Sequence, residues 1–146
     1  MAEHLWSILC RKVIIDREDN TVSIHEAFEG VKFLDPIPAE AYKDSVAIIS
    51  GDSSSAVMQL VTSWYRSVRS NPEKIEAMVR VVSPKGNTLL EQVFSVDLIS
   101  FVKCRTIYNF TGFLYVGDGT YIYSVHQMKD GEWQTGTRLL FDVNID

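Results

Sequence analysis

The chain has 146 residues and a formal net charge of −5, because 19 aspartate and glutamate residues outnumber 14 lysine and arginine residues. Its 46% hydrophobic and 11% aromatic content excludes a disordered chain, and its acidic balance argues against binding to nucleic-acid backbones. No stretch approaches the roughly 20 apolar residues that span a bilayer, so we expect one domain over residues 1–146 without a membrane segment.

Short strands are predicted over most of the chain, because apolar residues recur with a period of two and many are β-branched or aromatic. In the first half these strands cover 5–16, 21–33, 45–50 and 56–69. The first two flank a polar turn, which predicts a hairpin with Gly30 as a bulge in its second strand. Pro36 and Pro38 exclude 34–43 from a sheet, and residues 39–43 suit one helical turn.

Turn residues divide the second half of the chain in the same way. Residues 71–74 indicate a turn rather than the start of a short helix, because 79–82 continues as a strand. Pro84, Lys85 and Gly86 then close a hairpin. The predicted strands of this half cover 79–82, 89–96, 102–113, 121–128 and 133–145.

The loop of the last hairpin decides which of its residues face each other. A two-residue turn at Asp130 and Gly131 would place Tyr121 opposite Leu140. A three-residue loop places Tyr121 opposite Leu139 instead and aligns Tyr121, Tyr123 and Val125 with Leu139 and Phe141 on one face. Because a buried face should be continuous, we favour the three-residue loop.

About eight short strands with frequent turns and little helix predict an all-β fold, as an antiparallel sandwich or barrel. Two patterns favour a two-sheet immunoglobulin-like β-sandwich. Trp64 lies in mid-strand, where such domains carry a core tryptophan, and residues 118–123 resemble the start of the strand at which a tyrosine corner forms. Tyr123 stands where antibody domains carry a cysteine, so their inter-sheet disulfide is missing.

Short motifs along the whole chain resemble a family of small single-domain bacterial proteins of unknown function. They are Ile-Leu-Cys (8–10), Val-Ile-Ile-Asp (13–16), Val-Ser-Ile (22–24), Trp-Tyr (64–65), Val-Ser-Pro-Lys-Gly (82–86) and Gly-Thr-Tyr (119–121). The resemblance implies a β-sandwich and a bacterial or phage origin, and it implies no activity.

We expect a cytoplasmic protein. The apolar run 5–10 has Glu3 in front of it and Arg11 and Lys12 behind it, whereas a signal peptide carries its positive charge in front. The chain has only two cysteines, Cys10 and Cys104, which is a small number for a secreted domain. We interpret both as buried free thiols. The sequence leaves open whether they lie close enough to form a disulfide.

The candidate residues for catalysis and metal binding lack, at the required spacing, the further residues that such chemistry needs. Ser53 lies in a Gly-Asp-Ser block that resembles that of a group of serine esterases, but His126, the last histidine, has Tyr123 three positions before it instead of an aspartate. We therefore interpret the block as a loop and expect no enzymatic activity. His25, His126 and Cys104 would bind a metal only if the fold gathered them, because no histidine has a second ligand at chelating spacing. We expect no cofactor.

Aromatic residues on an exposed sheet face would indicate a binding role, since Trp and Tyr offer a large contact area. The candidate binding residues are Trp6, Trp64 and Trp133. We expect a non-enzymatic protein-interaction module that pairs with itself or with another protein through a sheet face or an edge strand. The alternative is a small-molecule-binding sandwich or barrel with the loops 36–43 and 51–55 at its mouth.

Overall fold

The computed structural model describes residues 2–16, 18–19, 21–33, 37–43, 46–49 and 57–145. The described elements, in chain order, are β1 (Glu3–Ile15), β2 (Val22–Ala27), β3 (Gly30–Val31), the 3₁₀ turn η1 (Ala39–Ala41), β4 (Ala47–Ile49), β5 (Met58–Tyr65), β6 (Glu73–Val82), β7 (Thr88–Leu98), β8 (Lys103–Phe110), β9 (Phe113–Tyr115), β10 (Gly119–Lys129) and β11 (Glu132–Val143). The all-β prediction and the helical turn are confirmed. The turn before β6 lies at 67–70 rather than at the predicted 71–74, because Glu73 and Lys74 already pair with β7.

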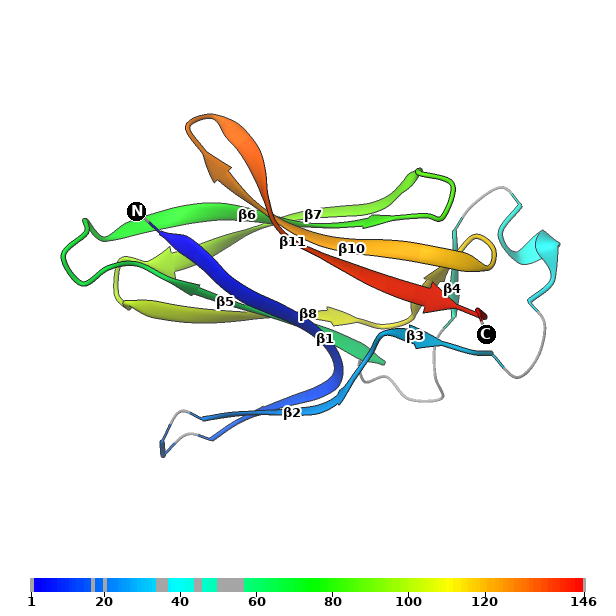
Figure 1. The fold of residues 1–146 in the computed structure, drawn as a ribbon, viewed down its shortest axis with the longest axis horizontal. Helices are drawn as coiled ribbons and strands as arrows, with labels where there is room; N and C mark the ends of the chain where they lie inside the picture. The colour runs from blue at the N-terminus through cyan, green and yellow to red at the C-terminus, as the bar shows by residue number, and fades with distance from the viewer. Residues whose placement is uncertain are drawn as a thin grey trace.

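The described strands form three sheets. Their orders are β2-β1-β5-β8, β3-β11-β10-β6-β7 and β4-β9. Pairing is antiparallel, as predicted, except that β3 runs parallel to β11. Figure 1 shows the four-stranded and five-stranded sheets as two layers, and the five-stranded sheet curls into a half-barrel.

The core lies between these two layers. Alternate residues of each strand point inward. The four-stranded sheet contributes Leu9, Leu60 and Trp64, and the five-stranded sheet contributes Val79, Val81, Tyr121, Tyr123, Val125 and Phe141. The predicted inward face of the last hairpin is therefore confirmed for these residues, while Leu139 packs against the same core and is only partly buried.

The loop of that hairpin differs from the prediction. Lys129 pairs with Glu132, and Asp130 and Gly131 both have positive φ angles, so the turn has two residues rather than three. A bulge then shifts the register between Val125 and His126, because Gly136 is an extra residue in β11. This shift brings Tyr121 opposite Phe141, so the predicted pair of Tyr121 with Leu139 is wrong by two residues. The bulge still keeps Tyr121, Leu139 and Phe141 on one face, as we had attributed to the loop.

Gly30 is the first residue of β3 and is not a bulge. It pairs with Asp142 of β11, and a Cβ atom at this position would overlap the carbonyl oxygen of Asp142. The predicted strand 102–113 is likewise two strands, β8 and β9. Gly112 separates them where the chain passes β4, and a Cβ atom here would lie 2.5 Å from the side chain of Ile48.

The predicted tyrosine corner is present at the start of β10. The hydroxyl of Tyr121 donates a hydrogen bond to the carbonyl oxygen of Gly117 at 2.6 Å and accepts one from the N–H of Val116 at 2.8 Å. The ring itself is fully buried. The corner thus fixes the loop between β9 and β10 to the edge of the core.

A bend in β1 shapes the outer side of the four-stranded sheet. β1 pairs with β5 from Glu3 to Cys10 and with β2 from Cys10 to Ile15. Where it changes partners it turns sharply, and the β1–β2 hairpin runs back along the sheet (Figure 1). At the bend Glu26 adopts a φ of 54°, and its carboxylate lies 2.6 Å from Nε of Arg11.

Candidate functional site

A groove of about 550 Å³ lies on the outer side of the four-stranded sheet. Its lining residues are Leu5, Trp6, Ile15, Ser63, Phe101, Lys103, Cys104 and Arg105. Leu5 and Ile15 lie ten residues apart on β1, so a straight strand would separate them by roughly 33 Å. The bend in β1 is therefore what brings them to one groove.

A bulge in β1 turns Trp6 toward this groove. His4 pairs with Trp64, and the two rings lie 5.1 Å apart on the inner side of the sheet. With strict alternation Trp6 would share that side with His4. The register shifts between them, and Trp6 instead pairs with Ser63 and lines the groove together with Leu5.

The groove combines exposed apolar side chains with positive charge. Phe101 is 60% exposed, Leu5 44% and Ile15 38%. The charged residues that line it, Lys103 and Arg105, are both basic, although the chain as a whole carries a net charge of −5. Adjoining exposed apolar side chains are typical of interaction sites.

The three candidate tryptophans lie in different surroundings. Trp6 is half-buried and lines the groove. Trp64 is fully buried in the core, where its Nε1 donates a hydrogen bond to Oγ1 of Thr62 at 2.7 Å, so it presents no surface to a partner. Trp133 is half-buried beside the turn of the β10–β11 hairpin, where it pairs with Met128. The structure therefore does not bring the three together.

Both cysteines are free, and the register keeps them apart. Cys10 pairs with Gln59 and Cys104 with Trp64, which lie five residues apart on β5. That spacing corresponds to roughly 17 Å along the strand, whereas a disulfide needs Cα atoms within about 7 Å. Burial raises the pKa of each thiol, so neither is activated as a nucleophile.

The residues considered for catalysis and metal binding are also separated. His25 lies on β2, Cys104 on β8 and His126 on β10. Among the residues that the structure describes, no three histidine, cysteine or acidic side chains gather as metal ligands. Ser53, the residue singled out in the Gly-Asp-Ser block, and the loop 51–55 lie outside the described residues.

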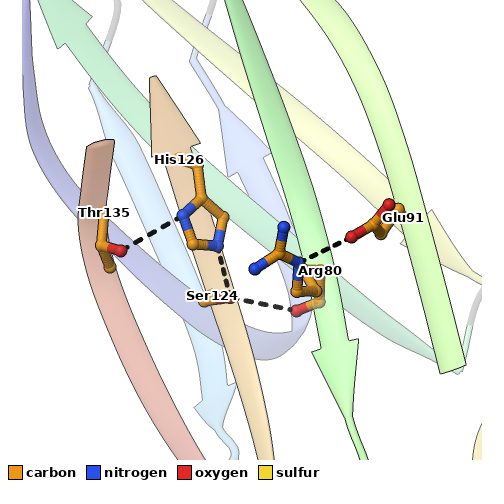
Figure 2. A network of polar contacts seen from close by, with 5 residues as sticks. All are labelled: Arg80, Glu91, Ser124, His126 and Thr135. Atoms are coloured by element: carbon orange, nitrogen blue, oxygen red, sulfur yellow. Dashed lines mark hydrogen bonds and ion pairs between the residues drawn. The ribbon is translucent and has the colours of Figure 1, made fainter. Parts of the chain in front are cut away.

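A serine–histidine pair that the sequence did not indicate lies on the five-stranded sheet. Figure 2 shows that Oγ of Ser124 and Nε2 of His126 lie 2.8 Å apart, with Oγ1 of Thr135 3.3 Å from Nδ1. The serine hydroxyl also lies 3.4 Å from the carbonyl oxygen of Arg80, whose guanidinium pairs with Glu91 at 2.8 Å. The only available signal is the spacing of two on one strand, which places both side chains on one face.

The contacts of this network are typical of a structural role rather than of a nucleophile–base pair. The nitrogen that a carboxylate would orient in a nucleophile–base pair instead meets a hydroxyl, that of Thr135. Two hydroxyls satisfy the one donor and one acceptor of a neutral imidazole. Both Ser124 and His126 are buried, so the network fixes the ring on the sheet.

We expect the free energy of unfolding to fall as the pH drops from 7.5 to 5. Burial lowers the pKa of His126, with Arg80 adding to the effect, and burial also lowers the pKa of His4. The folded chain therefore binds fewer protons than the unfolded one, whose histidines titrate near about 6.5. The contribution of these histidines to the free energy of unfolding is therefore fully present above that pH. It is lost as the pH falls through their lowered pKa values in the folded chain.

Urea denaturation at a series of pH values measures this dependence. His126→Gln should reduce the slope of stability against pH between 7.5 and 5. His25→Gln is the matched control, because His25 is exposed on β2, and it should leave the slope unchanged. Equal slopes for the wild type and both variants would contradict the assignment.

A second pocket, of about 480 Å³, lies near the tyrosine corner. Tyr42 and Lys43, from the predicted rim loop 36–43, line it together with Lys85, Asn87 and Asp118. Asp118 accepts hydrogen bonds from the hydroxyl of Tyr115 at 2.6 Å and from the side-chain amide of Asn144 at 2.8 Å, and these bonds lower its pKa. The pocket therefore holds two lysines beside a carboxylate that already has partners.

The chain matches no protein-family model, and the search of curated proteins finds no similar sequence. No helix in the described part of the chain has the length and apolar character that crossing a membrane requires.

Proposed function

We propose that this chain is a non-enzymatic protein-binding domain that takes a segment of its partner into the Trp6 groove. The observation that carries the proposal is the set of exposed apolar side chains that β1 and the β7–β8 connection gather there: Leu5, Ile15 and Phe101. Trp6 lines the same groove, and tryptophan is among the residues that most often dominate binding energy.

We also propose that the two layers form an immunoglobulin-like sandwich. The arrangement β1-β5-β8 facing β7-β6-β10-β11 supports this, since it parallels strands A, B and E facing C′, C, F and G. The tyrosine corner at the start of β10 supports it as well. One feature departs from the pattern: Trp64 lies on β5, in the other sheet from the strand that carries the core tryptophan of antibody domains.

A cytoplasmic location is part of the proposal. Cys10 and Cys104 are both free and lie too far apart to form a disulfide. Free thiols persist in a reducing compartment such as the cytoplasm, which supports this location.

Selection of peptides from a random display library against the purified chain tests the groove. We expect the wild type to enrich binders and Trp6→Ser with Phe101→Ser to lose at least about tenfold in affinity for them, which corresponds to 1.4 kcal/mol. Circular dichroism should show that the double variant remains folded, because neither side chain belongs to the core between the sheets.

Leu140→Ser is the matched control. Leu140 is 61% exposed, like Phe101, but lies on β11 of the other sheet. Binders that are lost with Leu140→Ser and kept by the groove variant would place the binding surface elsewhere. If no peptide is enriched and light scattering instead gives the mass of a dimer, the groove would be assigned to self-association.

Binding of a small molecule is the second candidate function, and the pocket lined by Tyr42, Lys43 and Lys85 favours it. Two lysines indicate an anionic ligand of metabolite size. A thermal shift produced by a small anion and removed by Lys85→Ser would identify this pocket as the functional site.

A further inference from the structure

The outer part of the β1–β2 hairpin has no third strand. From Lys12 to Ile15 β1 pairs with β2 alone, because its pairing with β5 ends at Cys10. We call residues 12–15 and 22–25 the arm, and Figure 1 shows that it turns away from β5. None of its aliphatic side chains belongs to the core between the sheets. A two-stranded hairpin alone is only marginally stable in water, so a further strand would stabilise the arm.

The pairing inside the arm fixes which backbone groups are used. The N–H of Asp16 donates a hydrogen bond to the carbonyl oxygen of Thr21 at 2.9 Å. The N–H of Val13 points away from β2 instead, to Oε1 of Gln59 at 2.8 Å. In an antiparallel pair both backbone groups of a residue point to the same side, and the side alternates along the strand. In the arm, the even-numbered residues of β1 and the odd-numbered residues of β2 therefore bond to each other.

Val22 and Ile24 consequently turn their N–H and C=O groups to the other side of β2. In the part of the chain that the structure describes, no strand pairs with β2 there. Ser23, which lies between them, is exposed, and so is His25. The donors and acceptors of Val22 and Ile24 are therefore a template for a further strand.

Two copies of this edge are complementary in their backbone groups. When they run antiparallel about a two-fold axis at Ser23, Val22 of each copy lies opposite Ile24 of the other. These are the residues whose backbone groups face outward, so each donor meets an acceptor. The next register in phase would place Val22 opposite Glu26, where a φ of 54° interrupts the regular strand.

The register about Ser23 also joins the aliphatic faces of the two arms. Val13 lies opposite Ile24 and Ile15 opposite Val22, so all four side chains point to one face. Across the four strands of two arms, each row then consists of Val13, Ile24, Val22 and Ile15, without a polar residue. β-Branched side chains pack well against such cross-strand neighbours.

The charges of the arm fit a second copy as well. Residues 16–20 at its tip carry three carboxylates and one arginine. Antiparallel pairing brings this acidic tip beside the base of the other arm, where Lys12 and His25 lie and where Arg11 is paired with Glu26. Opposite charges on neighbouring strands stabilise their pairing.

We propose that the chain self-associates by pairing the free edge of β2 with the same edge of a second copy. The two arms form one four-stranded antiparallel sheet in the order β1-β2-β2-β1, with the two-fold axis at Ser23. This inference goes beyond the proposed function, because peptide binding in the Trp6 groove does not require it.

Two charge variants at the axis test the pairing. Ser23→Lys and Ser23→Glu each place like charges next to each other in a homodimer and should raise its dissociation constant at least about threefold. An equimolar mixture of the two variants places opposite charges at the axis and should associate more tightly than either variant alone. Sedimentation velocity at a series of concentrations measures these constants. Because Ser23 is exposed, both variants should fold.

Amide hydrogen exchange by NMR locates the contact. At concentrations at which the wild type is a dimer, the amides of Val22 and Ile24 should exchange at least about fivefold more slowly than in dilute solution. The amides of Ser23 and His25 already face β1 in the monomer and should change less. Protection that does not alternate along β2 would overturn the proposal.

Ser95→Lys is the matched control. Ser95 is also exposed, on β7, which is an edge strand of the other sheet, so this variant should leave the dissociation constant unchanged. A chain that stays monomeric at every concentration, or a dimer that resists both Ser23 variants, would overturn the proposal. So would a dimer that is lost instead with Trp6→Ser and Phe101→Ser, since that result would place the contact in the groove.

Discussion

Replacing Trp64 with alanine is expected to lower the free energy of unfolding by about 3–5 kcal/mol, which is the usual range for removing a buried aromatic side chain. The ring is fully buried between the sheets, its Nε1 is bonded to Thr62, and the ring of His4 lies edge-on at 5.1 Å. Since a domain of this size is stable by only about 5–15 kcal/mol, this one substitution removes a large share of the stability.

Denaturation in guanidinium, followed by far-UV circular dichroism, measures the loss. Trp133→Ala is the matched control, because this half-buried tryptophan at the hairpin turn should cost under about 1 kcal/mol. Trp64→Phe keeps most of the ring and should fall between the two, so a variant remains measurable if alanine prevents folding. Similar losses for Trp64→Ala and Trp133→Ala would contradict the core position of Trp64.

The second large effect is expected for Tyr121→Phe, at about 1–3 kcal/mol. The substitution removes one oxygen atom but breaks two hydrogen bonds, one to the carbonyl of Gly117 and one from the N–H of Val116. It leaves a donor and an acceptor of the β9–β10 loop without their partner. The cost therefore comes from these backbone groups rather than from the loss of buried apolar area.

Tyr123→Phe separates this effect from the general loss of a tyrosine hydroxyl. Tyr123 is as deeply buried and lies on the same face of β10, but its hydroxyl bonds to none of the described residues. We expect its loss to change stability by less than about 0.5 kcal/mol. Hydrogen exchange adds a local readout, since the amide of Val116 should exchange faster in Tyr121→Phe alone. Equal losses in the free energy of unfolding for both variants would refute a stabilising role for the two hydrogen bonds of Tyr121.

The parts of the fold that follow from local periodicity could be predicted from the sequence. A period of two and turn residues such as Pro84 and Gly86 place the strands, and the alternation of Tyr121, Tyr123 and Val125 identifies a buried face. These features depend on neighbours in the chain. The tyrosine corner belongs here too, because its donor and acceptor lie within five residues of Tyr121.

The parts that depend on one inserted residue could not be predicted. The bulge at Gly136 restores the alignment that we used to choose a three-residue loop, and Gly136 lies against another strand: a Cβ atom there would come 3.1 Å from the ring of His4. Gly30 shows the same limit, because the backbone that it must approach belongs to Asp142. Local patterns contain no information on such distant neighbours.

The sequence did not predict the groove, and Trp6 is the one candidate binding residue that lines it. The sequence indicates that exposed tryptophan is informative, but it does not indicate which side of the sheet Trp6 faces, since the bulge after His4 sets that. Phe101 reaches the groove from the connection between β7 and β8, and Ile15 reaches it through the bend in β1. The Ser124–His126 pair was missed because two polar residues at this spacing are common on an outer sheet face.

The parallel pair of β3 and β11 has a consequence for how the protein is made. The amide of Phe33, just after β3, donates a hydrogen bond to the side chain of Asn144, 111 residues further along the chain. At the usual speed of roughly 5–20 residues per second, the ribosome finishes β3 on the order of ten seconds before its partner exists. During that interval Val31 and Phe33 have no sheet edge to join, so this stretch is open to chaperones that hold apolar segments of nascent chains.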